Sequence, residues 1–145
     1  MTPKQQERIK NKIKGIKSEL AADKKSWGGH YHDGRGLRYI PTSLYIQLDD
    51  NAGGLRYVNW FDKNFPEDVG APDVIFEFIL ILFKAKKLKE AEKKVTKYYE
   101  EIGFILDIYF GKKKNENFVY KHDQNELVEF SNWLTSVLEK INGRP

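Results

Sequence analysis

One stretch of the chain, residues 45–68 (YIQLDDNAGGLRYVNWFDKNFPED), constrains the fold more than any other. Residues 49–51 are Asp-Asp-Asn, whose side chains bond readily to their own backbone and so favour a tight turn. Beyond this turn, apolar residues recur at helical spacing until Pro66, which predicts an amphipathic helix that ends before the proline. Gly54 lies inside this helix, where glycine costs about 1 kcal/mol relative to alanine. We therefore expect Gly54 to permit a close approach between two helices.

The same plan recurs further along the chain. Pro41 begins a short helix over residues 42–50, which pairs with the helix described above. Pro72 then begins a helix over Asp73–Lys84 that is apolar nearly all round, which predicts a buried element. After a turn at the two following lysines, Leu88–Glu101 is predicted to be its partner helix, with Ala91 as the small residue in its middle.

Further helices are predicted at both ends of the chain. Thr2 and Pro3 provide a start for a helix over residues 1–26, whose apolar stripe is surrounded by lysines. Residues 104–121 leave two alternatives open, a short buried helix or a pair of strands. A final amphipathic helix begins near Asp123, where a capping box is expected, and covers the last face of the core.

The loop over residues 27–40 carries the most reactive side chains of the chain. Its glycines break any helix, and the first interpretation is a packed connecting loop. Three functional alternatives remain: a metal site at His30, His32 and Asp33; an anion site formed by backbone N–H groups with neighbouring arginines; and an aromatic recognition patch. The two histidines converge on a metal only in an extended or turning segment, so we predict no metal site and no cofactor.

These helix pairs resemble the tetratricopeptide repeat, which is a pair of antiparallel helices. The residues that carry the resemblance are Tyr45, Gly54, Val58 and Pro66 in the first pair and Phe78, Leu82, Ala91 and Val95 in the second. Several positions depart from the pattern, including Arg38, Pro41 and Thr42 at the start of the first unit, Asp49 and Lys86 at the turns, and Phe61 and Tyr98 in the second helices. The chain is also similar to bacterial helical proteins without an assigned activity.

The resemblance implies an all-α fold, in which helical hairpins stack into a short right-handed solenoid. We expect a single domain over residues 1–145. Its parts would be an N-terminal helix (1–26), a glycine-rich loop (27–40), two repeat-like helix pairs (41–102), and a C-terminal packing and capping segment (103–145).

Composition restricts the classes of function further. The chain has no cysteine, which removes disulfides, thiol nucleophiles and cysteine zinc sites and fits a cytoplasmic protein. The net charge is +4, but residues 1–26 carry eight basic and three acidic residues, so this segment alone accounts for the excess. The apolar runs of the chain are too short for a membrane span, which takes about 20 residues.

We expect a non-enzymatic module that binds a protein or peptide, including the possibility of neutralising a toxin. Glu77 is the one acid within the apolar run of residues 74–83, and no catalytic constellation accompanies it. The alternative is a nucleic-acid-binding protein that uses the basic first helix with Arg35 and Arg38. The residues predicted to contact a partner come from the loop and from the first helix of each pair: Trp27, Tyr31, Arg35, Arg38, Tyr39, Ser43, Gln47, Asp73, Phe76 and Lys84.

Overall fold

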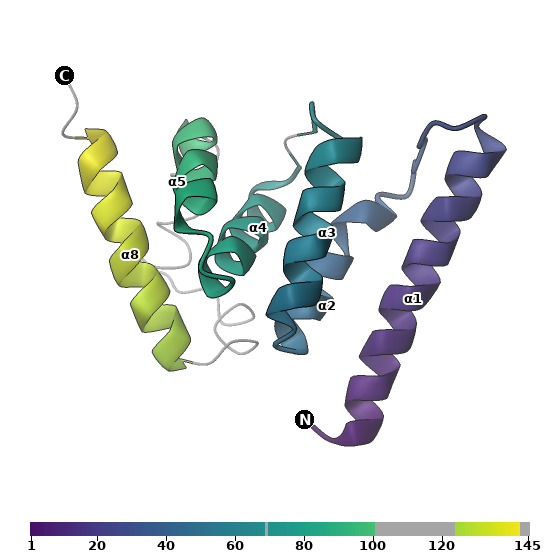
Figure 1. The fold of residues 1–145 in the computed structure, drawn as a ribbon, viewed down its shortest axis with the longest axis horizontal. Coiled ribbons are helices and arrows are strands. Elements are labelled where there is room, and N and C mark those ends of the chain that lie inside the picture. Colours follow the sequence, from purple (N-terminus) through teal and green to yellow (C-terminus); the bar gives the residue numbers. More distant parts are fainter. Residues whose placement is uncertain (69, 101–123, 143–145) are drawn as a thin grey trace. The chain divides into compact units, whose positions relative to one another are not determined.

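The computed structural model describes residues 1–68, 70–100 and 124–142, and all regular structure in these ranges is helical (Figure 1). The prediction of an all-α protein is confirmed for this part of the chain. The helices are α1 (Pro3–Ser26), α2 (Pro41–Gln47), α3 (Asn51–Asn64), α4 (Pro72–Lys84), α5 (Leu88–Lys97) and α8 (Gln124–Asn142), with a 3₁₀ turn, η1, at Leu37–Tyr39. The chain divides into two compact units, Met1–Pro66 and Glu67–Pro145, and each is described by itself.

Helix α1 begins as its sequence predicts. The Thr2 hydroxyl accepts a hydrogen bond from the Gln5 backbone N–H at 3.1 Å, and the Gln5 side chain accepts one from the Thr2 N–H at 2.9 Å. This reciprocal capping box satisfies two backbone donors that would otherwise lack partners. Ile13, Ile16 and Leu20 form the buried stripe of the helix, while its lysines remain exposed.

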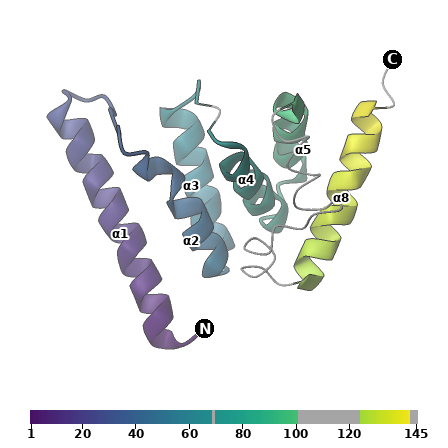
Figure 2. The same ribbon diagram turned by 180° about the vertical axis from the view of Figure 1, so that it is seen from behind.

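In the first unit, α2 packs against α3, and it lies behind α3 in Figure 1 and in front of it in Figure 2. The turn between them contains Asp49 in the left-handed region, with φ 54°. Asp50 caps α3, because its Oδ1 accepts a hydrogen bond from the Gly53 N–H at 2.9 Å. Val58 and Phe61 of α3 are almost fully buried and contribute the centre of this core.

The glycine pair in α3 reveals a tight contact that periodicity alone does not locate. Gly54 is buried, and its predicted packing role stays a prediction. At Gly53, a Cβ atom would lie 2.7 Å from the Tyr45 Cε1 atom and 2.3 Å from the Asp50 Oδ2 atom. Side-chain atoms do not approach this closely, so glycine at position 53 is required by the packing of α2 against α3 and by the cap.

In the second unit, α4 is the central element and packs against α5. Phe76 is fully buried and meets Phe130 of α8 edge-on, with ring centroids 5.2 Å apart. Ala91 and Val95 are the fully buried residues of α5. Helix α5 ends at Lys97, and the Tyr98 N–H bonds to the Lys94 carbonyl. Tyr99 and Glu100 are again helical, and Glu101, where the predicted helix ends, lies outside the described residues.

Three predictions about the fold stay predictions. Residues 104–121 lie outside the described residues, so the alternatives of helix and hairpin both remain, as does the capping box at Asp123. The solenoid arrangement and its tetratricopeptide-like character also stay predictions. Among the described residues, no helix has both the length and the apolar character needed to cross a membrane.

Candidate functional site

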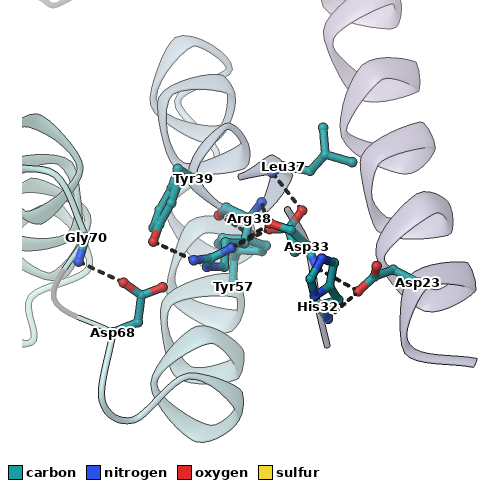
Figure 3. Close-up of polar contacts among 9 residues, drawn as sticks. All are labelled: Asp23, His32, Asp33, Leu37, Arg38, Tyr39, Tyr57, Asp68 and Gly70. Atoms are coloured by element: carbon teal, nitrogen blue, oxygen red, sulfur yellow. Dashed lines mark hydrogen bonds and ion pairs between the residues drawn. The ribbon is translucent and has the colours of Figure 1, made fainter. Parts of the chain in front are cut away.

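The glycine-rich loop folds around a buried carboxylate, Asp33, which is 6% exposed (Figure 3). Its backbone adopts the left-handed region, with φ 41°. Its Oδ1 accepts a hydrogen bond from the Leu37 N–H at 2.9 Å, and its Oδ2 accepts one from the Arg38 N–H at 3.1 Å. Asp33 thereby satisfies the first backbone donors of η1 in the manner of a helix cap.

The Arg38 side chain completes the same network. Its Nη1 donates to the Asp33 Oδ2 at 2.8 Å and to the Asp33 carbonyl at 3.1 Å. Its Nη2 donates to the Tyr39 hydroxyl at 2.7 Å, and the guanidinium lies 4.3 Å from the centroid of the Tyr39 ring. The Arg38 side chain is only 19% exposed, and the Asp33 carboxylate compensates its charge inside the loop.

Two further contacts attach the loop to the helices on either side. Asp23 of α1 accepts hydrogen bonds at its Oδ2 from the His32 N–H at 2.8 Å and the Asp33 N–H at 3.0 Å (Figure 3). Tyr57 of α3 donates its hydroxyl proton to the Arg38 carbonyl. Burial, and secondarily the negative charge of Asp33, raises the pKa of the Tyr57 hydroxyl above its usual range, so Tyr57 stays protonated and remains a donor.

The histidines of the loop do not converge with Asp33. His32 is exposed and stacks on Trp27, with ring centroids 4.4 Å apart, and His30 is exposed as well. The Asp33 carboxylate is occupied by Arg38 and by two backbone amides. Within the described ranges, no three His, Cys, Asp or Glu residues are grouped so that they could hold a metal ion. These contacts are those of a packed connecting loop.

A pocket of about 370 Å³ lies between α1, the loop and α3. The residues that line it are Lys17, Leu20, Ala21, Tyr31, Arg56, Tyr57 and Trp60. Leu20 and Tyr57 are 2% and 3% exposed and form its base. The Trp60 ring is half-buried, lies 5.3 Å from the Tyr57 ring and meets the Tyr31 ring edge-on at 5.6 Å. Three of the seven lining residues are therefore aromatic.

The charge around this pocket is positive. Lys17 and Arg56 are exposed lining residues, and the pocket has no acidic lining residue among those described. Neither cation forms an ion pair within the part of the chain that the structure describes. The Lys17 Nζ lies 5.4 Å from the Tyr45 ring centroid, and the Lys24 Nζ lies 5.2 Å from that of Tyr31. Lys17 and Arg56 are therefore exposed cations with no carboxylate partner among the described residues.

The loop residues predicted to contact a partner lie in different environments. Tyr31 lines the pocket, whereas Arg38 and Tyr39 are hydrogen-bonded to each other inside the loop. Trp27 is 56% exposed and is covered on one face by His32. Arg35 forms an exposed ion pair with Glu19 at 2.9 Å. Of this group, only Tyr31 reaches the pocket.

The remaining predicted contacts lie on α2 and α4. Ser43 and Gln47 of α2 are half-buried, and the Ser43 hydroxyl donates to the Ile40 carbonyl at 3.2 Å. On α4, Asp73 is exposed and Lys84 is half-buried. Phe76 is 0% exposed, so core packing explains this side chain. A partner-binding role for the exposed and half-buried residues stays a prediction.

Sequence reasoning did not single out Lys17, Arg56 and Trp60 as site residues. In the sequence, Lys17 is explained as an exposed lysine on an amphipathic helix and Trp60 as part of the aromatic face of α3, and Arg56 carries no signal of its own. Arg56 and Trp60 are four residues apart and so share a helical face, which is the signal that could have paired them. The pocket depends, however, on the placement of α1 beside that face.

Comparison of the chain with protein-family models, with curated protein sequences and with solved structures gives no match. The resemblance to the tetratricopeptide repeat therefore stays a prediction, supported only by the residues that carry it.

Proposed function

We propose that the protein is a non-enzymatic interaction module built from tetratricopeptide-like helix pairs, and that its first unit binds a segment of another protein at the pocket between α1 and α3. The observation that carries this proposal is a pair of exposed cations, Lys17 and Arg56, that form no ion pair among the described residues and lie beside the aromatic rings of the pocket. An apolar pocket with a few convergent polar groups is the usual form of a binding site.

The internal use of the buried polar groups supports binding over catalysis. Asp33 is the buried carboxylate of the first unit, and its oxygens accept from Arg38 and two backbone amides. Tyr57 is held as a protonated donor to a backbone carbonyl. An acid–base catalyst has to reach a substrate, so groups engaged in this way serve the fold. The pocket itself presents cations and aromatic rings.

Nucleic-acid binding is the second candidate, and the exposed lysines of α1 favour it. Lys10, Lys14 and Lys17 follow one another at helical spacing on one side of α1 and could contact phosphates. The two arginines assigned to this function are less available, because Arg35 is paired with Glu19 and Arg38 with Asp33. We therefore rank protein binding first.

The proposal is tested by affinity capture with the full chain and two matched variants. Ala21 and Ala22 are both exposed residues of α1, but only Ala21 lines the pocket. We expect the parent protein to recover the same defined protein partner from a native lysate with and without nuclease treatment. Ala21→Trp should lose that partner because the indole occupies the pocket, whereas Ala22→Trp should retain it.

Two results would overturn the proposal in different ways. Recovery of mainly nuclease-sensitive material would favour the nucleic-acid alternative. Equal recovery of a protein partner by both tryptophan variants, with unchanged circular dichroism spectra, would place the interaction at another surface.

A further inference from the structure

We infer that the pocket between α1 and α3 binds an acidic peptide segment, which inserts one apolar side chain against Trp60 and Tyr57 and places its carboxylates beside Lys17 and Arg56. This inference rests on the proposed function and adds the chemistry of the partner.

The dimensions and lining of the pocket fit a single apolar anchor. Its volume of about 370 Å³ falls in the range of roughly 300–1,000 Å³ found for ligand pockets. The lining combines the Leu20 side chain with the rings of Tyr31, Tyr57 and Trp60, so an aliphatic or aromatic side chain would exchange water for apolar contact on several sides. An anchor of this kind supplies most of the binding energy in many interfaces.

The charge of the surroundings selects the residues next to that anchor. Lys17 comes from α1 and Arg56 from α3, so the two cations approach the pocket from two elements. Lys10 and Lys14 precede Lys17 by seven and three residues, which extends the positive surface along the same side of α1. Carboxylates beside the anchor would meet cations on both sides, and a basic peptide would meet repulsion.

The state of the aromatic rings favours a peptide over a nucleic acid. Single-stranded nucleic acids bind by stacking bases on open aromatic faces. The Trp60 ring already has three aromatic neighbours: Tyr57 at 5.3 Å, Tyr31 at 5.6 Å and Phe65 at 5.7 Å. A side chain that enters the pocket requires no open ring face, whereas a stacked base does.

The inference is tested with the full chain and a fluorescent peptide of about twelve residues, in which glutamates surround a central Leu-Phe pair. Fluorescence anisotropy measures the binding of this peptide and of a matched peptide with glutamine at each glutamate position. We expect the acidic peptide to bind about tenfold more tightly than the neutral one, equivalent to about 1.4 kcal/mol. Lys17→Glu combined with Arg56→Glu should abolish this preference. Lys12→Glu, an exposed change on α1 away from the pocket, should preserve it.

A charge-swapped peptide guards against loss of folding in the double variant. We expect Lys17→Glu/Arg56→Glu to bind a peptide with lysine at each glutamate position about tenfold more tightly than the parent protein does. This result would establish both the location of the site and the sign of its charge. Equal affinity of the parent for the acidic and neutral peptides would overturn the inference.

Competition with a single-stranded oligo(dT) of about twelve nucleotides distinguishes nucleic-acid binding from peptide binding. Tighter binding of the oligonucleotide than of the acidic peptide, with a steep loss of affinity at higher salt, would also overturn the inference and favour a nucleic acid. If only the peptide preference fails, while Ala21→Trp still abolishes capture of a protein partner, the proposed function stands and the chemistry assigned to the partner is wrong.

Discussion

Replacing Asp33 by asparagine removes one negative charge from the loop network and leaves its shape nearly unchanged. The Asp33 side chain is 2% exposed and the Arg38 side chain 19% exposed, and their ion pair spans 2.8 Å. Asparagine tolerates the left-handed backbone at this position and retains one side-chain oxygen as an acceptor. Asparagine is neutral, so the guanidinium of Arg38 loses its charged partner. Asparagine also cannot accept at both former carboxylate oxygens.

The expected cost follows from these contacts. A hydrogen bond to a charged group contributes about 1.5–3 kcal/mol, and the partial exposure of Arg38 places this pair below the cost of about 3–5 kcal/mol for breaking a fully buried one. We therefore expect Asp33→Asn to lower the free energy of unfolding by about 2 kcal/mol. Asp33→Gly also loses the hydrogen bonds that the asparagine oxygen can retain, to the Arg38 N–H and to the Arg38 guanidinium, at about 1 kcal/mol each, for a total of roughly 4 kcal/mol. Asp33→Ala adds about 1 kcal/mol of left-handed backbone strain.

The measurement has to report on the first unit alone. The chain contains three tryptophans, of which Trp27 and Trp60 belong to the first unit and Trp133 to the second. In a Trp133→Phe background, tryptophan fluorescence during urea unfolding follows the first unit. A double-mutant cycle with Arg38→Met then isolates the pair, and its coupling energy should exceed about 1 kcal/mol.

This expectation is wrong if the free energy of unfolding of Asp33→Asn lies within about 0.5 kcal/mol of that of the parent. In that case the ion pair would contribute nothing net, and Asp33 would act only as a cap for η1. A ranking in which Asp33→Ala is as stable as Asp33→Gly would refute the argument from backbone strain separately.

Three further substitutions are expected to change stability in predictable directions. Gly15→Ala in α1 should raise the free energy of unfolding by about 0.5–1 kcal/mol, because no atom lies within 4 Å of the added Cβ and the residue is exposed in a helix. Gly53→Ala should lower it by about 1–3 kcal/mol, because the Cβ meets Tyr45 and the cap, and equal stabilisation at both glycines would contradict the packing argument. Tyr57→Phe should cost about 1 kcal/mol at neutral pH. Because the folded-state pKa of Tyr57 is raised, its unfolded form loses its proton first, and the parent should lose up to about 1.4 kcal/mol per pH unit above about pH 10 from this group. Urea unfolding between about pH 9 and pH 11 should show a shallower loss in Tyr57→Phe, and parallel curves would refute the assignment.

The helices could be predicted from the sequence because their signals are local. Prolines at positions 3, 41 and 72 begin α1, α2 and α4, and apolar spacing identifies their buried faces. The interruption at Tyr98 was less predictable, because the apolar stripe continues through this residue, whereas α5 ends at Lys97 and helix resumes at Tyr99. Gly53 escaped notice because its constraint comes from Tyr45 on another helix, and periodicity carries no information about such contacts.

The candidate site was predictable only in part, for a related reason. The loop was recognised from its glycines and its reactive side chains, and Tyr31 within it does line the pocket. The roles of Asp33 and Arg38 depend on a left-handed backbone and on hydrogen bonds that form only when the loop closes on itself. Lys17 and Arg56 are separated by 39 positions in sequence, so only the packed first unit brings them to one pocket.

The loop network and the pocket are connected through the backbone on either side of Tyr31. Asp23 accepts hydrogen bonds from the N–H groups of His32 and Asp33, the two residues that follow Tyr31. Tyr57 holds the Arg38 carbonyl with its hydroxyl and lines the pocket with its side chain. The polar network therefore fixes the position from which the Tyr31 ring forms one side of the pocket. Residues that the sequence offers as a possible metal or anion site serve instead to hold the aromatic side of the pocket in place, and the shape of the pocket depends on the loop together with α1 and α3.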